Sequence, residues 1–314
     1  MTTVLITHPS FLNHDTGAHH PERADRLRAI DKVLGHDVYK DLVRREAPMR
    51  DDVREAIELA HPGGYYAELD KARPLAGQGL RQIDGDTTMS EGSWEAALRA
   101  VGAGLDAVDL VMKKETANVF CQVRPPGHHA ESAKAMGFCL FNNIAIAAHY
   151  ARAKHGAERV AVVDFDVHHG NGTQEIFWSD KNMFYGSTHQ MPLFPGTGAL
   201  NETGVGNIWN APLREGDARE NFEAAFRERI LAPLHNFAPD FVFISAGFDA
   251  HKDDPLAGIE LVEADFMWAT EELLKVARRH SGGRVVSMLE GGYDLTALAR
   301  SVAVHVKTLM EAGT

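Results

Sequence analysis

The sequence predicts a three-layer α/β/α fold around a central, mostly parallel sheet. Continuously apolar strand-like runs alternate with helix-like stretches, and no linker, repeat or low-complexity segment divides the chain. Strands that are apolar without a break are typical of parallel sheets whose two faces are covered by helices. The 314 residues can bury a large core, and we expect one domain spanning residues 1–314.

The elements follow in order along the chain. Apolar runs predict strands at residues 3–7, 117–124, 159–166, 182–189, 240–247 and 284–290. Amphipathic stretches predict helices at residues 21–35, 90–114, 142–156, 217–237, 263–280 and 295–312. Gly35 and Gly156 stand where two of these helices should end. The stretch from His189 to Gly216 lacks periodicity, and we expect a long functional or mobile loop there.

Composition excludes several classes of protein. The net charge of −12 argues against direct nucleic-acid binding, which needs a basic surface. There is no run of 18 apolar residues and no signal-peptide pattern at the start, so we expect a cytoplasmic protein without a membrane span. Two cysteines, Cys121 and Cys139, do not suggest a disulfide framework or a cysteine zinc site.

Four predicted strands end in polar residues that are unusual for an apolar core. The segments that follow them are 125–129, 167–170, 248–255 and 291–294, and they are rich in histidine, aspartate and glycine. Ligands of open α/β sheets bind outside the carboxyl ends of the strands. We therefore expect these segments, which are far apart in sequence, to converge on one site.

The segment "VVDFDVHH" at residues 162–169 indicates a metal site. If the strand persists, Asp164, Asp166 and His168 alternate onto one face, where aspartate and histidine can grip one divalent ion. Asp254 or Asp253 is the natural third ligand. Three protein ligands with one open position are typical of a catalytic site, and the mixed oxygen and nitrogen set suits zinc, iron(II), cobalt or manganese.

The motifs "RPPGHHA", "GFCLFNN", "DFDVHHGNGTQEIF", "FPGTG", "SAGFDAHKDDPLAG" and "LEGGYDL" resemble those of the zinc-dependent histone deacetylase superfamily. The resemblance extends from "HPERADRL" to "EGGYDL", nearly the whole chain, and is nearer to the class II and bacterial members, including acetylpolyamine amidohydrolases. It implies the fold shared by arginases and deacetylases. It also implies a zinc ion, with iron(II) or cobalt as substitutes, held by Asp166, His168 and Asp254. A structural potassium ion would be held by main-chain carbonyls of Asp164, Asp166 and His168 together with Ser187.

The resemblance also implies catalytic roles. His128 and His129 would be the paired histidines beside the metal. Asp164 would accept a hydrogen bond from His128, and Asn171 would accept one from His129. Tyr293 would donate a hydrogen bond to the substrate carbonyl. Zinc lowers the pKa of a bound water from about 15.7 to about 7, and a histidine can take the proton as the water attacks and pass it to the leaving amine. We assign that general-base role to His129.

Substrate contacts follow from the same resemblance. Phe138, next to Gly137, and Phe194 would line a narrow acyl-lysine tunnel, and Asp86 would hold the substrate backbone at its rim. Leu261, seven residues after Asp254, resembles the apolar lining of lysine deacetylases, whereas polyamine-selective relatives carry an acidic residue there. Glu260 is adjacent, so a shift of one position in register would reverse this inference.

We therefore expect an amide hydrolase that removes acetyl or other acyl groups from the ε-amine of lysine in peptides or proteins. The main alternative is hydrolysis of acetylated polyamines or other small acylated amines. A metal-bearing protein that binds acylated amines without cleaving them would lack Tyr293 or the histidine pair, and both are present. An arginase-like two-metal enzyme would need more aspartate ligands. A homo-oligomer built through the His189–Gly216 loop is also compatible with the sequence.

Overall fold

A computed structural model describes residues 2–313 and contains an eight-stranded sheet in the order β2-β1-β5-β10-β9-β6-β7-β8. Every neighbouring pair in this sheet is parallel. The strands are β1 (Thr3–Thr7), β2 (Val43–Glu46), β5 (Asn118–Cys121), β6 (Val160–Asp164), β7 (Met183–Gln190), β8 (Ile208–Leu213), β9 (Phe241–Ala246) and β10 (Val285–Leu289). A separate antiparallel pair joins β3 (Arg81–Asp84) to β4 (Thr87–Met89). The predicted three-layer α/β fold is confirmed.

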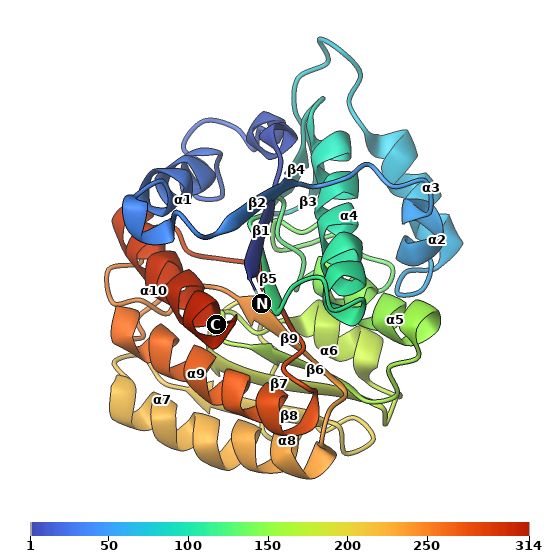
Figure 1. Cartoon of the computed structure of the whole chain (residues 1–314). Helices are drawn as coiled ribbons and strands as arrows, with labels where there is room; N and C mark the ends of the chain where they lie inside the picture. Colours follow the sequence, from blue (N-terminus) through green and yellow to red (C-terminus); the bar gives the residue numbers. More distant parts are fainter. Residues whose placement is uncertain (1, 314) are drawn as a thin grey trace.

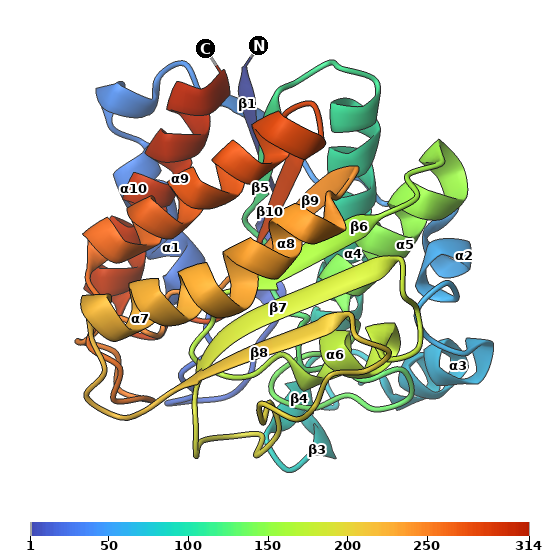
Figure 2. The same ribbon diagram turned by 90° about the horizontal axis from the view of Figure 1, so that it is seen from below.

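Helices cover both faces of the sheet (Figure 1). One face is covered by α4 (Ser93–Met112) and α5 (Asn143–His155), with α2 (Val53–Ile57), α3 (Gly63–Ala72) and α6 (Asn171–Phe177) nearby. The other face is covered by α1 (Asp25–Leu34), α7 (Arg219–Ala225), α8 (Ala232–Phe237), α9 (Glu263–His280) and α10 (Leu295–Gly313). Figure 2 shows the strands β5, β10, β9, β6, β7 and β8 in this order between the two layers.

The central strands are buried on both faces because helices pack on each side. Every residue of β5, β6, β9 and β10 is buried, which explains why their sequences lack the alternation of half-exposed strands. Helix α5 is capped at its start by Asn142, whose side chain accepts a hydrogen bond from the Ala145 N–H at 3.0 Å. It ends at Gly156, which has a left-handed φ of 70°, as the sequence predicts.

Two edge strands were not predicted. β2 has the sequence VRRE and is exposed at every position, so charge rather than apolar patterning defines it. β8 lies inside the stretch 189–216 that was expected to be a loop, and it carries Pro212 and Asn210. Proline is tolerated there because β8 pairs only with β7.

Three helix predictions differ in detail. The helix expected at 21–35 begins at Asp25. The helix expected at 217–237 begins at Arg219, and a π-helical turn at Phe226–Leu231 divides it into α7 and α8. The helix expected at 90–114 begins at Ser93. Among residues 2–313, no helix combines the length and apolar character needed to cross a membrane.

Candidate metal and catalytic site

The four polar strand ends converge because β5, β10, β9 and β6 are consecutive in the sheet. Parallel strands place their carboxyl ends at the same edge, so the segments after these strands share one location (Figure 2). The sequence prediction of a single site built from four distant segments is thus supported by the strand order.

The end of β6 differs from the expected continuous strand. β6 ends at Asp164, and the chain then turns, so alternation along a strand does not explain how the three polar residues meet. The turn is held by side chains instead. Asp164 Oδ1 accepts the Asp166 N–H at 3.0 Å, and Asp166 Oδ1 accepts the His168 N–H at 2.9 Å. These local bonds are typical of aspartate in turns.

Three potential metal ligands meet beyond this turn. Atoms of Asp166, His168 and Asp249 all lie within 4.8 Å of one another, and all three residues are buried. His168 Nδ1 is 3.2 Å from Asp166 Oδ1 and 3.0 Å from Asp249 Oδ2. Burial, followed by the charge of Asp166, raises the pKa of Asp249. A divalent cation would relieve this repulsion, so the donor set fits a metal such as zinc.

Asp254, the expected third ligand, lies outside this group of three. Its Oδ2 accepts the N–H groups of Tyr293 at 2.7 Å and Asp294 at 3.3 Å, and its Oδ1 accepts the Leu256 N–H at 3.0 Å. Burial and then the charge of Asp249 raise the pKa of Asp254 to about 7. The charge of Asp249 therefore acts on Asp254, and the hydrogen bonds of Asp254 hold the Tyr293 loop near the three ligands.

Two glycines allow the backbone to approach the carboxylates closely. A Cβ atom on Gly247 would lie 1.9 Å from Asp166 Oδ2, and one on Gly291 would lie 2.2 Å from Asp249 Oδ2. The Gly291 N–H donates to Asp166 Oδ2 at 2.8 Å. A side chain at either glycine position would displace the carboxylate of Asp166 or Asp249.

The paired histidines have different partners at the same distance. His128 Nδ1 donates to Asp164 Oδ2 at 2.9 Å, and His129 Nδ1 lies 2.9 Å from Asn171 Oδ1. Burial would lower the pKa of His128, but Asp164 and Asp166 raise it to about 10. Burial lowers the pKa of His129 well below its ordinary value, and the charge of His128 lowers it further. The different partners therefore shift the pKa values of the two histidines in opposite directions.

Tyr293 lies at the same edge, in the loop after β10. Burial raises the pKa of its hydroxyl well above the ordinary value, so it is a proton donor at neutral pH. The Arg26 guanidinium lies 5.1 Å from the ring centroid, and its Nε donates to the Gly292 carbonyl at 2.6 Å. Arg26 in turn contacts buried Glu22 at 3.1 Å. Arg124 pairs with the same Glu22 carboxylate and has a structural role.

Aromatic rings surround these groups. The Phe194 ring centroid is 5.1 Å from that of His129 and 6.4 Å from that of His168, and the side chain is 40% exposed. The Phe138 ring lies 6.0 Å from that of Tyr293, nearly perpendicular to it. The two phenylalanines predicted to line the approach therefore lie beside the catalytic candidates.

Asp86 supports the loop that carries Phe138. Its Oδ1 accepts the Gly137 N–H at 2.9 Å, and Thr87 Oγ1 accepts the Phe138 N–H at 3.0 Å. Phe138 has a left-handed φ of 68°, which these bonds hold in place. Glycine is needed at position 137 because the Cβ of any other residue would lie 2.4 Å from His129 Cδ2.

Leu261 is not at an accessible rim in the structure. It is fully buried, its backbone pairs with Ala250 and Lys252, and it borders the interior side chains of Phe165 and Val167. Glu260 beside it is exposed. Ser187 is opposite Asp164 in the β6–β7 pairing, and its Oγ lies 2.9 Å from His189 Nδ1. Its part in a potassium site stays a prediction.

Sequence reasoning missed two groups of the site. Asp249 lies in the turn after β9 and Asp166 lies in the turn after β6, and an aspartate just beyond the end of a buried strand is the signal that could have identified it. Glu290 is fully buried, accepts the N–H groups of Gly127 at 2.7 Å and His128 at 3.1 Å, and has its pKa raised to about 7 by burial. A glutamate directly after an apolar strand is the corresponding sequence signal.

These features fit a hydrolase with a candidate metal site beside paired histidines and a tyrosine, and comparisons with known proteins name the family. Residues 20–309 match the family model described as the histone deacetylase domain. The chain belongs to the histone deacetylase family, whose members are generally zinc-dependent hydrolases.

Individual relatives agree with this assignment. A "Probable deacetylase" of Archaeoglobus fulgidus is 36% identical over 302 residues, covering 94% of this chain and 82% of the relative. A "Histone deacetylase-like amidohydrolase" of Pseudomonas aeruginosa is 38% identical over 282 residues, covering 88% and 72%. The crystal structure of the HDA15 HD domain superposes with a TM-score of 0.91 at 35% identity, covering 99% of this chain and 88% of that one.

Proposed function

We propose that the protein hydrolyses the amide bond of acyl-lysine in peptides or proteins. The observation that carries amide hydrolysis is the asymmetry of the paired histidines, since His128 is bonded to a carboxylate and His129 to an amide. The choice of acyl-lysine is supported by the match to the histone deacetylase domain. A neutral histidine beside a cationic one supplies a base and a fixed positive charge in one site.

Asp166 and His168 would hold the metal, with a third oxygen from Asp254, as the family resemblance implies, or from Asp249, which lies within 4.8 Å of both. When bound, the metal supplies Lewis-acid polarisation of the scissile carbonyl and activation of water. The potassium ion near Asp164 and Ser187 and the cytoplasmic location remain parts of the proposal.

The protein's own residues then perform the proton transfers. His129 Nδ1 donates to Asn171, which leaves Nε2 as the free base that accepts a proton from the attacking water and delivers it to the leaving ε-amine. His128 stays protonated and stabilises negative charge through Nε2, which is 3.9 Å from Asp166. The Tyr293 hydroxyl donates to the developing oxyanion.

The substrate class is tested by comparing kcat/KM for an acetyl-lysine peptide and for N-acetylated polyamines with zinc-loaded enzyme. We expect a preference for the peptide. A strong preference for acetylpolyamines would overturn the lysine assignment, and the Glu260→Gln variant would then identify whether this exposed carboxylate selects the distant cationic nitrogen.

A further inference from the structure

One buried carboxylate contacts the main chain at the paired histidines. Glu290 directly follows β10 and is only 1% exposed. Its Oε2 accepts the N–H groups of Gly127 at 2.7 Å and His128 at 3.1 Å. Because these N–H groups belong to consecutive residues, one oxygen fixes the direction of the chain where the two histidines begin. The proton transfers proposed above do not use this contact.

The contact lies where main-chain pairing between β5 and β10 has ended. The last pair in their register joins Cys121 to Met288. The prolines at positions 125 and 126 carry no N–H group, so the main chain there cannot donate to a neighbouring strand. The next two N–H groups along the chain are those that Glu290 accepts. A side chain therefore holds the histidine segment to the end of β10.

The main chain at Glu290 is itself held, and it leads directly into the loop that carries Tyr293. The Glu290 N–H donates to the Ala246 carbonyl at 3.0 Å. The following N–H, that of Gly291, donates to Asp166 Oδ2 at 2.8 Å. Glu290 thus connects two catalytic segments, the one after β5 with the histidines and the one after β10 with the tyrosine.

We propose that Glu290 is a positioning residue that sets the placement of the histidine pair relative to Tyr293. It acts through the main chain of Gly127 and His128. The inference rests on the proposed hydrolysis for its kinetic test, and a second test needs no turnover.

The kinetic test compares two variants of the zinc-loaded enzyme on an acetyl-lysine peptide. Glu290→Met removes the acceptor, and we expect kcat to fall about 100-fold, the effect of displacing a catalytic group by about 1 Å. KM should stay within about twofold, because the buried side chain is remote from the exposed approach.

Glu290→Gln should rescue most of this loss, to within about fivefold of the parent kcat. The glutamine oxygen can accept both N–H groups, and its amide nitrogen can donate to Ser245 Oγ, which lies 3.4 Å from Glu290 Oε1. A residue that served only to keep the fold intact would not separate kcat from KM in this way.

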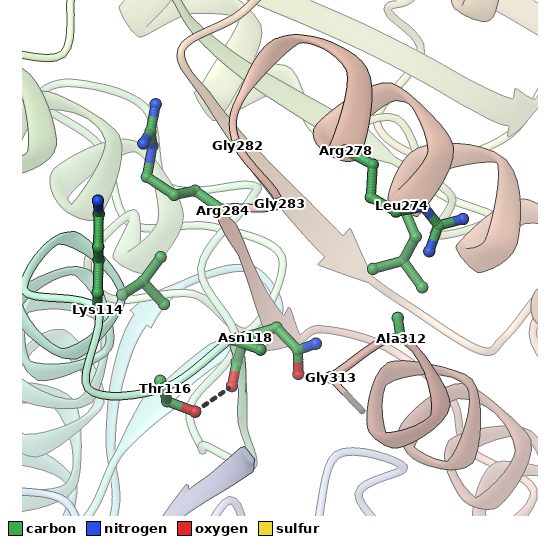
Figure 3. Close-up of a pocket in the computed structure, with 12 residues that line it drawn as sticks. Lys114, Thr116, Asn118, Leu274, Arg278, Gly282, Gly283, Arg284, Ala312 and Gly313 are labelled. Atoms are coloured by element: carbon green, nitrogen blue, oxygen red, sulfur yellow. Dashed lines mark hydrogen bonds between the residues drawn. The ribbon is translucent and has the colours of Figure 1, made fainter. Parts of the chain in front are cut away.

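Asp240→Leu is the matched control, because Asp240 makes the same kind of contact where the strands begin. Its Oδ2 accepts the N–H groups of Glu158 at 3.1 Å and Arg159 at 2.9 Å, just before β6. Its carbonyl accepts Arg284 Nε at 2.9 Å. Figure 3 shows this edge of the sheet, with Arg284 before β10 and Asn118 at the start of β5. The control should keep the parent kcat.

The second test is amide hydrogen exchange, followed by NMR on the zinc-loaded proteins. Exchange at Gly127 and His128 should be about tenfold faster or more in Glu290→Met, because both N–H groups lose their acceptor. It should stay slow in Glu290→Gln and in Asp240→Leu. This result judges the contact even if the parent enzyme releases no acetate, an outcome that would count against the proposed hydrolysis instead.

Any of three results would overturn the positioning role. The first is a parent-like kcat in Glu290→Met. The second is an equal loss of kcat in the Gln and Met variants, which would make the charge of Glu290 and not its contacts the cause. The third is unchanged exchange at Gly127 and His128 in Glu290→Met. Thermal unfolding of each variant shows whether a loss of kcat is a loss of fold.

Discussion

The side-chain amide of Asn171 donates to Glu131 Oε1 at 2.8 Å, and this bond turns the amide oxygen toward His129. Because the oxygen can only accept, His129 must carry its proton on Nδ1 when neutral. The position of Glu131, two residues after His129, therefore fixes the tautomer that a general base requires.

Replacing Glu131 tests this arrangement. Glu131→Gln allows the Asn171 amide to reverse, so we expect kcat to fall about tenfold while metal content stays the same. The adjacent Ser132→Ala removes a hydroxyl that bonds Glu175 instead and is the matched control. Equal kcat in the Glu131 variant and the parent enzyme would show that the amide does not need this anchor.

The Tyr293 hydroxyl is expected to act only in the transition state. Tyr293→Phe should lower kcat about 100-fold or more and leave the metal stoichiometry unchanged, as for the loss of an oxyanion donor. Steady-state kinetics with metal analysis of the same sample measures both. A kcat near that of the parent enzyme would remove Tyr293 from the mechanism.

Arg26 should support both stability and the position of Tyr293. Arg26→Met removes one partner of buried Glu22 and the bond to the Gly292 carbonyl, so we expect a loss of about 3 kcal/mol in unfolding free energy and a lower kcat. Arg23→Gln removes a half-exposed charge nearby and should change stability by less than about 0.5 kcal/mol. Denaturant unfolding compares the two, and equal stabilities would contradict the assignment.

Gly291 should not tolerate a side chain. Gly291→Ala places a methyl group 2.2 Å from Asp249 Oδ2 and 2.5 Å from Asp166 Oδ2, so metal affinity should fall sharply. Gly85→Ala is the control, because nothing lies within 4 Å of its Cβ position. Competition with a metal chelator reports both affinities, and an unchanged value for Gly291→Ala would exclude these carboxylates as the metal site.

Acid should destabilise the protein through buried neutral histidines such as His61. Burial lowers the pKa of His61 to about 4, and its ring nitrogens are bonded to the Ser132 carbonyl at 2.9 Å and the Asn142 N–H at 3.0 Å. The unfolded chain takes up a proton below its pKa of 6.5, whereas the folded chain does so only below about 4. Stability therefore falls as the pH drops from 6.5 to 4, by about 1.4 kcal/mol per unit for each such group.

His61→Gln keeps one donor and one acceptor but cannot be protonated in this range. The slope of unfolding free energy against pH should decrease by about 1.4 kcal/mol per pH unit between pH 6.5 and 4, which corresponds to the uptake of one proton. His36→Gln, which changes an exposed histidine, is the matched control. Identical slopes for the His61 variant and the parent protein would contradict the buried-neutral assignment.

Patterning of apolar residues was sufficient to predict the sheet core, because β5, β6, β9 and β10 are continuously buried. It could not predict β2 or β8, since an edge strand such as VRRE has no apolar signature. Motif spacing predicted which segments meet at the site. It did not reveal that Asp249 approaches His168 or that Asp254 holds the Tyr293 loop, because both depend on how the turns after β9 and β10 pack together.

The third metal ligand can be identified by comparing the metal affinity of variants at Asp249 and Asp254. Asp249→Asn and Asp254→Asn each remove one carboxylate charge at the site, and the variant that loses metal binding identifies the ligand. The other variant should retain metal and lose activity through misplacement of its hydrogen-bond partners. Retention of full metal affinity by both would mean that neither aspartate is a ligand.

The most direct test of amide hydrolysis by the paired histidines measures acetate release from an acetyl-lysine peptide by the zinc-loaded parent enzyme and by His129→Gln. We predict hydrolysis by the parent enzyme and a loss in kcat of about 100-fold or more in the variant, at equal metal content. No acetate release by the parent enzyme, or a kcat within a few-fold for His129→Gln, would contradict the proposed mechanism.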